Sequence, residues 1–118
     1  MKLTPEVKAL RAITEAQWQR TVQDIARGNG WRCYHAPRAG IRANGSVRTV
    51  EAGWPDLTLV RGTRLVFVEL KRETGKTTEA QDGWLSALSK ASAEAYVWRP
   101  SDLDEVRTSL GRREQVAA

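Results

Sequence analysis

The sequence predicts a mixed α/β domain in which helices flank a central sheet, in the order α-α-β-β-β-α-β-α. Three observations support this expectation. Apolar residues recur at helical spacing behind capping residues near both ends of the chain. Between them lie short runs rich in β-branched and aromatic residues, separated by glycines. The length of 118 residues suffices for one hydrophobic core and leaves no room for a second.

Two helices are expected at the start of the chain. Thr4-Pro5-Glu6 is typical of a helix start, because Thr caps free N–H groups and Pro is tolerated in the first turn. This helix is expected to end near Ile13. Thr14-x-x-Gln17 then forms a capping box for a longer helix, which Gly28-Asn29-Gly30 ends. The buried stripe of this longer helix is predicted to be Trp18, Val22 and Ile25.

Three strands are expected in the middle of the chain. Residues 31–35 are predicted to form the first strand. A long loop over residues 36–53 separates it from the others. Residues 56–61 and 64–71 are predicted to form a hairpin joined at Gly62-Thr63, because both runs are apolar and glycine punctuates them.

The C-terminal part predicts a helix, a strand and a final helix. The first helix begins at Thr77 or Thr78 and packs its apolar face on the sheet. Residues 94–99 form the last core strand, which a proline ends. Residues 101–104 are a capping box for a helix that continues to Leu110. The expected divisions are an N-terminal helical extension (1–13), a single domain (14–111) and a flexible tail (112–118).

Composition narrows the classes of function. The 19 basic and 14 acidic side chains give a net charge of +5, which favours a polyanionic partner. Cys33 is the single cysteine, so an internal disulfide and a cysteine-rich zinc site are excluded, and we expect a small buried side chain there. No stretch approaches the ~18 apolar residues of a membrane helix. We therefore expect a cytoplasmic protein that does not bind membranes.

Charged residues interrupt the predicted hairpin at one end. Asp56 opens its first strand, while Glu69 and Lys71 lie at the end of its second. The start of one antiparallel strand lies beside the end of the next, and alternation places Glu69 and Lys71 on one face. Two carboxylates suit Mg²⁺, which lowers the pKa of bound water and neutralises charge on a phosphodiester. The pattern indicates metal-assisted phosphodiester hydrolysis; the alternative is a solvated Glu69–Lys71 pair at a strand edge.

These residues also resemble a known signature. Pro55-Asp56, followed by Glu69-Leu70-Lys71, resembles the PD-(D/E)XK nuclease motif. With Gly53-Trp54 before it, and with Gly75-Lys76 and Gln81-Asp82-Gly83-Trp84-Leu85 after it, the pattern is similar to the VRR-NUC branch, the virus-type replication-repair nucleases. The resemblance covers roughly residues 14–99. It implies a restriction-endonuclease-like core and a Mg²⁺- or Mn²⁺-dependent DNA endonuclease.

The resemblance also implies a role for each residue of the motif. Asp56 and Glu69 hold the metal, the backbone carbonyl of Leu70 completes its shell, and Lys71 serves the nucleophile. Glu15 supports the attacking water or a second ion.

Glu15 and Gln81 each allow a second interpretation. Glu15 in a first helical turn also fits an acid that complements the helix dipole. Gln81 is part of the active-site surround in the family, and it equally fits a side chain that satisfies a backbone group. His35 ends the first strand and receives no role.

Basic residues flank the expected metal edge. Arg38, Arg42 and Arg48 lie in the 36–53 loop, and guanidinium groups there suit contacts with a DNA backbone. They fit equally a solvated loop that is basic without a role. Lys76 precedes a helix N-terminus, where it adds positive field at a place that favours anions.

The resemblance implies a structure-specific nuclease of branched, Holliday-junction-like duplex DNA, acting in repair or recombination. So small a domain has little surface for reading a long base sequence, which agrees with recognition of DNA shape. Symmetric cutting of two strands would need a homodimer. The implied location is the nucleoid of a bacterial or phage-infected cell. The alternatives are a nickase or exonuclease of the same fold, and a catalytically inactive basic module that binds nucleic acid.

Overall fold

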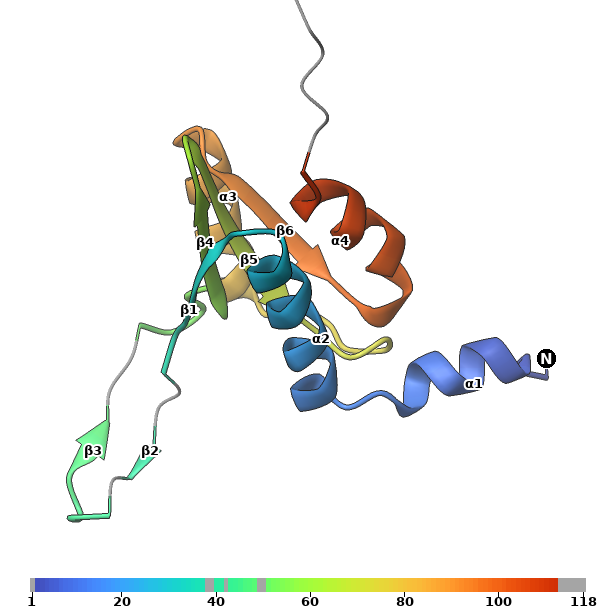
Figure 1. Ribbon diagram of the computed structural model, residues 1–118. Helices are drawn as coiled ribbons and strands as arrows, with labels where there is room; N and C mark the ends of the chain where they lie inside the picture. Colours follow the sequence, from blue (N-terminus) through green and yellow to red (C-terminus); the bar gives the residue numbers. More distant parts are fainter. Residues whose placement is uncertain (1, 38–39, 42, 49–50, 113–118) are drawn as a thin grey trace, which may run out of the picture.

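The computed structural model describes residues 2–37, 40–41, 43–48 and 51–112 (Figure 1). The elements follow the predicted order, with a small hairpin added between the first and second core strands. Their bounds are α1 Pro5–Ala12, α2 Glu15–Gly28, β1 Arg32–His35, β2 Gly40–Ile41, β3 Val47–Arg48, β4 Leu57–Arg61, β5 Arg64–Leu70, α3 Glu79–Lys90, β6 Glu94–Trp98 and α4 Leu103–Leu110. Among these helices, none has the length and apolar character that crossing a membrane requires.

The N-terminal helices begin where their capping residues predict. The Thr4 side chain accepts a hydrogen bond from the Val7 N–H, and Thr14 and Gln17 form the reciprocal capping box of α2. The buried stripe of α2 differs by one residue from the prediction. Ala26 is fully buried beside Trp18 and Val22, whereas Ile25 is only partly buried at the margin of the core. The reason is that positions i, i+4 and i+8 share one helix face.

The central sheet has four strands in the order β1-β4-β5-β6. β1 and β5 each pair with β4 in antiparallel fashion, and β6 pairs with β5 in parallel. The parallel pair requires a crossover between its strands, which α3 supplies. The predicted mixed sheet flanked by helices is therefore confirmed.

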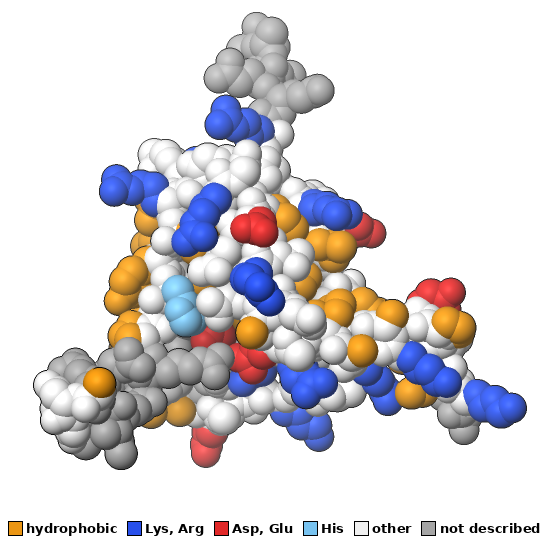
Figure 2. Space-filling model, turned by 60° about the horizontal axis from the view of Figure 1, so that its bottom comes forward, with side chains coloured by type: hydrophobic (Ala, Val, Ile, Leu, Met, Phe, Trp, Pro, Cys, Tyr) orange, Lys and Arg blue, Asp and Glu red, His pale blue; other side chains and the backbone are white. Residues whose placement is uncertain are grey.

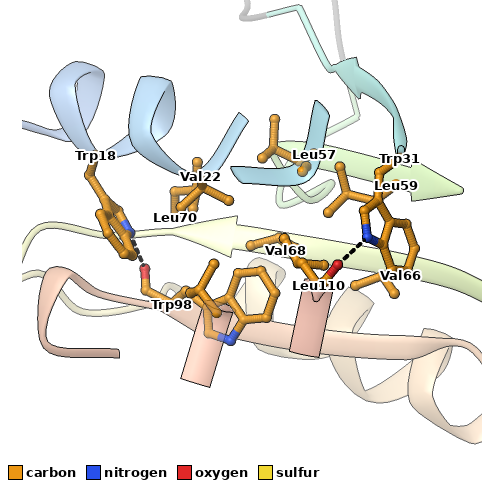
Figure 3. Close-up of a cluster of buried hydrophobic side chains, with 12 residues drawn as sticks. Trp18, Val22, Trp31, Leu57, Leu59, Val66, Val68, Leu70, Trp98 and Leu110 are labelled. Carbon is orange, nitrogen blue, oxygen red and sulfur yellow. Dashed lines mark hydrogen bonds between the residues drawn. The ribbon is translucent and has the colours of Figure 1, made fainter. Parts of the chain in front are cut away.

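The hydrophobic core lies on one face of this sheet, under α2 and α4 (Figure 3). Val66, Val68 and Leu70 of β5 all point into it, as period-two alternation requires. Two buried indoles form hydrogen bonds at the margins of the core (Figure 3). Trp18 Nε1 donates to the Trp98 carbonyl at 2.9 Å, and Trp31 Nε1 donates to the Leu110 carbonyl at 2.8 Å. The core therefore buries one face of β5 from Val66 to Leu70.

The opposite face of the sheet carries α3 and is covered less completely. Trp54 meets Phe67 and Trp84 edge to face, with ring centroids 5.5 Å and 4.9 Å apart. α3 itself has no fully buried residue. It packs against β5 and β6, so it leaves uncovered the part of this face that β1 and β4 form among the described residues.

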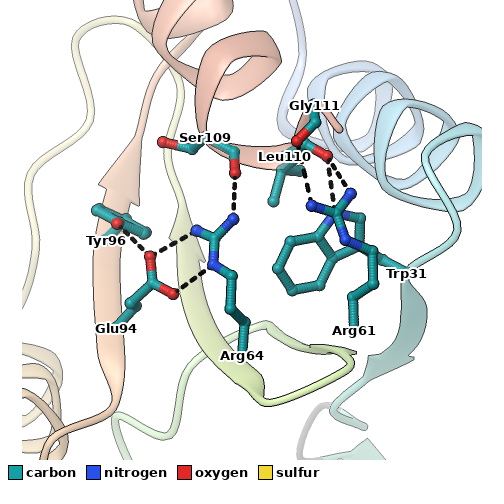
Figure 4. Close-up of polar contacts among 8 residues, drawn as sticks. All are labelled: Trp31, Arg61, Arg64, Glu94, Tyr96, Ser109, Leu110 and Gly111. Atoms are coloured by element: carbon teal, nitrogen blue, oxygen red, sulfur yellow. Dashed lines mark hydrogen bonds and ion pairs between the residues drawn. The ribbon is translucent and has the colours of Figure 1, made fainter. Parts of the chain in front are cut away.

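Two arginines tie the turn of the β4–β5 hairpin to the end of α4 (Figure 4). Arg61 donates to the carbonyls of Asn29, Leu110 and Gly111. Arg64 forms a two-pronged ion pair with Glu94, at 2.9 and 2.7 Å, and donates to the Ser109 carbonyl. Both guanidinium groups lie over the Trp31 ring. These basic side chains serve the fold.

Two further details of the prediction are wrong. The 36–53 segment contains the β2–β3 hairpin, whose two-residue strands are too short to leave an alternating pattern in the sequence. The predicted cap at 101–104 is replaced by a 3₁₀ turn, Pro100–Asp102, before α4. Asp102 there accepts from the Arg99 N–H at 2.8 Å, while the Ser101 N–H donates to Glu73.

Candidate active site

The predicted carboxylates lie together at the end of the sheet where β4 begins and β5 ends. Leu57 of β4 pairs with Val68 of β5, so the preceding residue, Asp56, lies beside Glu69. Oδ2 of Asp56 accepts a hydrogen bond from the Leu70 N–H at 2.9 Å, which fixes its carboxyl against the end of β5. Both side chains lie on the α3 face, away from the main core.

Glu69 is buried to an unusual degree for a carboxylate. Only 2% of it is exposed, and it is the one fully buried polar or charged residue within the described ranges. Its Oε1 accepts from Gln81 Nε2 at 2.9 Å and lies 3.7 Å from Lys71 Nζ. Its Oε2 is buried and has no hydrogen-bond partner in the described part of the chain. An ionised oxygen in this condition is costly.

The electrostatics of the pair follow from this geometry. The pKa of Glu69 is raised from 4.5 to about 8, chiefly by burial and then by the charge of the neighbouring Asp56 carboxyl. The charge of Lys71 lowers the pKa of Glu69, while the charge of Glu15 raises it. The pair therefore demands either a shared proton or a cation.

Gln81 joins the start of α3 to this pair. Its Oε1 accepts from the Thr78 N–H at 2.8 Å, and its own N–H donates to Thr78 Oγ1 at 3.2 Å, which completes a capping box. With the amide oxygen held this way, the amide nitrogen points at Glu69. The two interpretations of Gln81 are thus compatible, because one side chain satisfies a backbone group and contacts the carboxylate.

The family model of the VRR-NUC domain matches residues 13–102. The chain belongs to the VRR-NUC family. The matched range contains Asp56, Glu69, Lys71 and Gln81. A VRR-NUC domain is a nuclease of the PD-(D/E)XK type, and nucleases of this family are generally metal-dependent. Comparison with curated proteins and with solved structures gave no match.

The carboxyl groups of Asp56 and Glu69 fit a hard divalent cation. Mg²⁺ needs only one or two protein carboxylates, since water and substrate complete its shell. Asp56 and Glu69 supply two, and the partnerless Oε2 of Glu69 is an oxygen that a cation would satisfy. Within the described residues no three His, Cys, Asp or Glu side chains are gathered as a ready-made centre. Glu15, the first residue of α2, is half-buried, and its charge acts on Glu69.

Gly53 is a site residue whose role sequence reasoning missed. Its φ is +82°, and a Cβ built there would lie 2.4 Å from the Ala80 carbonyl carbon and 2.7 Å from the Gln81 nitrogen. Glycine alone allows the segment before Asp56 to rest on the first turn of α3. The motif Gly-Trp-Pro-Asp was the available signal, but its contact with α3 is tertiary.

A hollow of about 410 Å³ opens over Asp56 and Glu69. It is lined by Tyr34, Ala36, Pro37, Glu51, Ala52, Gly53, Trp54, Asp56, Glu69 and Gln81. Figure 2 shows Lys and Arg side chains spread over the face drawn, with acidic side chains between them. The aromatic side chains of Tyr34 and Trp54 in the lining of this hollow were not predicted.

The predicted DNA-binding residues and His35 lie on segments other than the two strand ends that carry the carboxyl pair, or outside the described residues. Lys76 is exposed in the segment that leads into α3. Arg38 and Arg42 lie outside the described residues, and for Arg48 the structure describes the backbone alone, in β3. His35 pairs with the core residue Leu57 and so points away from the carboxylates, its buried Nε2 without a partner among the described residues.

Proposed function

We propose that this VRR-NUC domain is a Mg²⁺- or Mn²⁺-dependent DNA endonuclease that hydrolyses phosphodiester bonds in branched duplex DNA. The observation that carries the proposal is the Asp56–Glu69 pair, two adjacent carboxyl groups of which one is buried with a partnerless oxygen. A fold keeps such a pair at an energetic cost, and sites of this kind are characteristic of function. Membership of a nuclease family supplies the reaction class.

Each proposed role rests on a contact or a position. Asp56, Glu69 and the Leu70 carbonyl would hold the cation, and when bound it would neutralise charge on the phosphodiester and lower the pKa of its water. Gln81 orients the Glu69 carboxyl, and the Leu70 N–H orients that of Asp56. The Lys71 ammonium, held 3.7 Å from Glu69, stabilises the negative charge of the attacking hydroxide. Glu15 supports the water or a second ion.

The proposed DNA contacts are electrostatic. The net charge of +5 favours a polyanion, and Arg61 and Arg64 are committed to backbone carbonyls and to Glu94. Backbone contacts are therefore assigned to other basic residues, namely Arg38, Arg42, Arg48 and Lys76.

A branched substrate and a homodimer complete the proposal. The domain is too small to read a long base sequence, which supports recognition of DNA shape. Symmetric cutting of both strands requires two sites related by a twofold axis. A substrate of this kind implies a cytoplasmic, nucleoid-associated protein.

The test is cleavage of an end-labelled four-way junction and of linear and circular duplexes, each with Mg²⁺, Mn²⁺ or EDTA. We expect metal-dependent cuts placed symmetrically about the branch point. Nicks in circular duplex alone would indicate a nickase, and loss of label only from ends an exonuclease. Salt-sensitive binding without cutting in either metal would contradict the enzyme and indicate a binding module.

A further inference from the structure

The open part of the sheet adjoins the carboxylates on the same face. Tyr34 of β1 pairs with Thr58 of β4, and the Ala36 N–H donates to the Asp56 carbonyl at 2.9 Å. Alternation therefore places the side chains of Tyr34, Thr58 and Asp56 on one face of the sheet. Tyr34 stands one strand away from Asp56, on the side that α3 leaves uncovered.

This surface is apolar and exposed. Tyr34 is 59% exposed, and Val60 and Leu65, on the same face, are 38% and 41% exposed. They are three of the four large apolar side chains that are exposed among the described residues. Arg32, two residues before Tyr34 on β1, adds a cation to the same face.

Tyr34 also lines two adjacent hollows. One is the 410 Å³ hollow that contains Asp56 and Glu69. The other, of about 240 Å³, is lined by Arg32, Cys33, Tyr34, Thr58 and Val60. The ring thus stands on a continuous path from the carboxylates along the sheet surface.

An exposed aromatic ring on a sheet beside a cation is the arrangement that proteins use to stack unpaired bases. A base inside a duplex cannot reach such a ring, because it is paired and stacked. We propose that Tyr34 stacks on an unpaired nucleobase of the DNA strand that passes the Asp56–Glu69 pair, while Arg32 contacts its phosphate. The preferred substrate then carries unpaired nucleotides next to the cut; this inference rests on the proposed nuclease function.

Charge and position favour DNA over a second copy of the chain as the occupant of this surface. A second copy would bring the same net charge of +5 to a face that already carries Arg32. A nucleic-acid strand brings the opposite charge, and the surface is continuous with the hollow over the carboxylates.

The test separates stacking from cleavage. The fluorescent base 2-aminopurine is placed in the unpaired segment of a branched oligonucleotide, and the protein is added with EDTA so that binding is measured without cutting. We expect quenching by the parent protein and by Tyr34→Phe, which keeps the ring. Tyr34→Leu keeps apolar bulk without the ring, and it should abolish quenching and weaken binding of the branched DNA roughly tenfold. Affinity for a fully paired duplex should not change.

Leu3→Ala is the matched control, since Leu3 is 39% exposed on the distant N-terminal segment, and it should behave as the parent. Equal quenching by the parent and Tyr34→Leu would overturn the proposal. The proposal would also be overturned if Tyr34→Leu lost a dimer that the parent forms while its quenching stayed unchanged. The Tyr34 surface would then be the contact with a second copy of the chain. Tyr34-dependent quenching by a protein that cuts no DNA would refute the nuclease function alone. Cutting that prefers no unpaired bases and ignores Tyr34 would refute stacking alone.

Discussion

The two ends of the β4–β5 hairpin treat charge in opposite ways. At the turn, Arg61 and Arg64 find carbonyl oxygens, a carboxylate and an aromatic face within reach (Figure 4). At the other end, Asp56 and Glu69 lie beside each other with like charge, and one buried oxygen has no partner in the described chain. The first arrangement lowers the free energy of the fold; the second raises it.

The difference shows which charges of a hairpin are structural. A charge whose partners are supplied by the same chain has its task within the fold. A buried carboxyl group that has a second carboxyl group beside it and an oxygen without a partner is complete only with something from outside. Substitutions at the two ends should therefore separate stability from activity.

Substitution at the carboxylate end should have the largest effect. Asp56→Asn or Lys71→Ala is expected to abolish metal-dependent cutting, while DNA affinity stays within about tenfold because backbone contacts dominate binding. Asp56→Asn should not lower the free energy of unfolding, since an amide oxygen can still accept from the Leu70 N–H and one like charge is removed. Junction cleavage and urea titration measure the two quantities. Turnover equal to the parent would remove these residues from the mechanism.

Gly53→Ala should damage both properties at once. A methyl group at φ +82° and 2.4 Å from the Ala80 backbone forces α3 away from the carboxylates. We expect a loss of about 1–3 kcal/mol in the free energy of unfolding, together with most of the cutting activity. The control lies on the same helix: Gly83 has nothing within 4 Å of a built Cβ, so Gly83→Ala should keep activity and gain about 0.5–1 kcal/mol. Equal behaviour of the two variants would contradict this role of Gly53.

Arg64→Ala, at the turn end, should lower stability alone. The change removes the two-pronged ion pair with Glu94 and a donor to the Ser109 carbonyl, at a cost of about 1–3 kcal/mol. Cutting per folded molecule, measured well below the melting temperature, should match the parent. A fall in turnover per folded molecule would show that the two ends are coupled.

The pH dependence of stability should sharpen the contrast without a change at the turn end. In the folded state the pKa of Glu69 is raised from 4.5 to about 8, so its contribution to stability is complete below pH 4.5 and is lost as the pH rises through 8. Metal-free protein should therefore lose stability over this range, and Glu69→Gln should remove that part of the loss. Urea titrations in EDTA at several pH values check this. A Glu69→Gln profile parallel to that of the parent would contradict the raised pKa.

Local signals in the sequence account for most of the fold. Thr4, Thr14 and Thr78 cap helices that begin where expected, because a cap and its acceptor lie within one turn. The antiparallel register that joins Asp56 to Glu69 likewise follows from a two-residue turn between apolar strands.

Tertiary contacts account for what the sequence did not reveal. The contact of Gly53 with α3 joins segments far apart in the chain, and no periodicity encodes it. The exposure of Tyr34 depends on which strands α3 happens to cover. The Asp102 carboxylate accepts from the Arg99 N–H across the 3₁₀ turn, so it makes no side-chain cap for α4.

The double use of Gln81 has a consequence for how the domain could be silenced. The Gln81 side chain that caps the first turn of α3 also donates the hydrogen bond that orients the Glu69 carboxyl. Fraying of that single turn would release the carboxylate while the core under α2 and α4 stays intact. A local opening far too small to register as unfolding would then switch off hydrolysis.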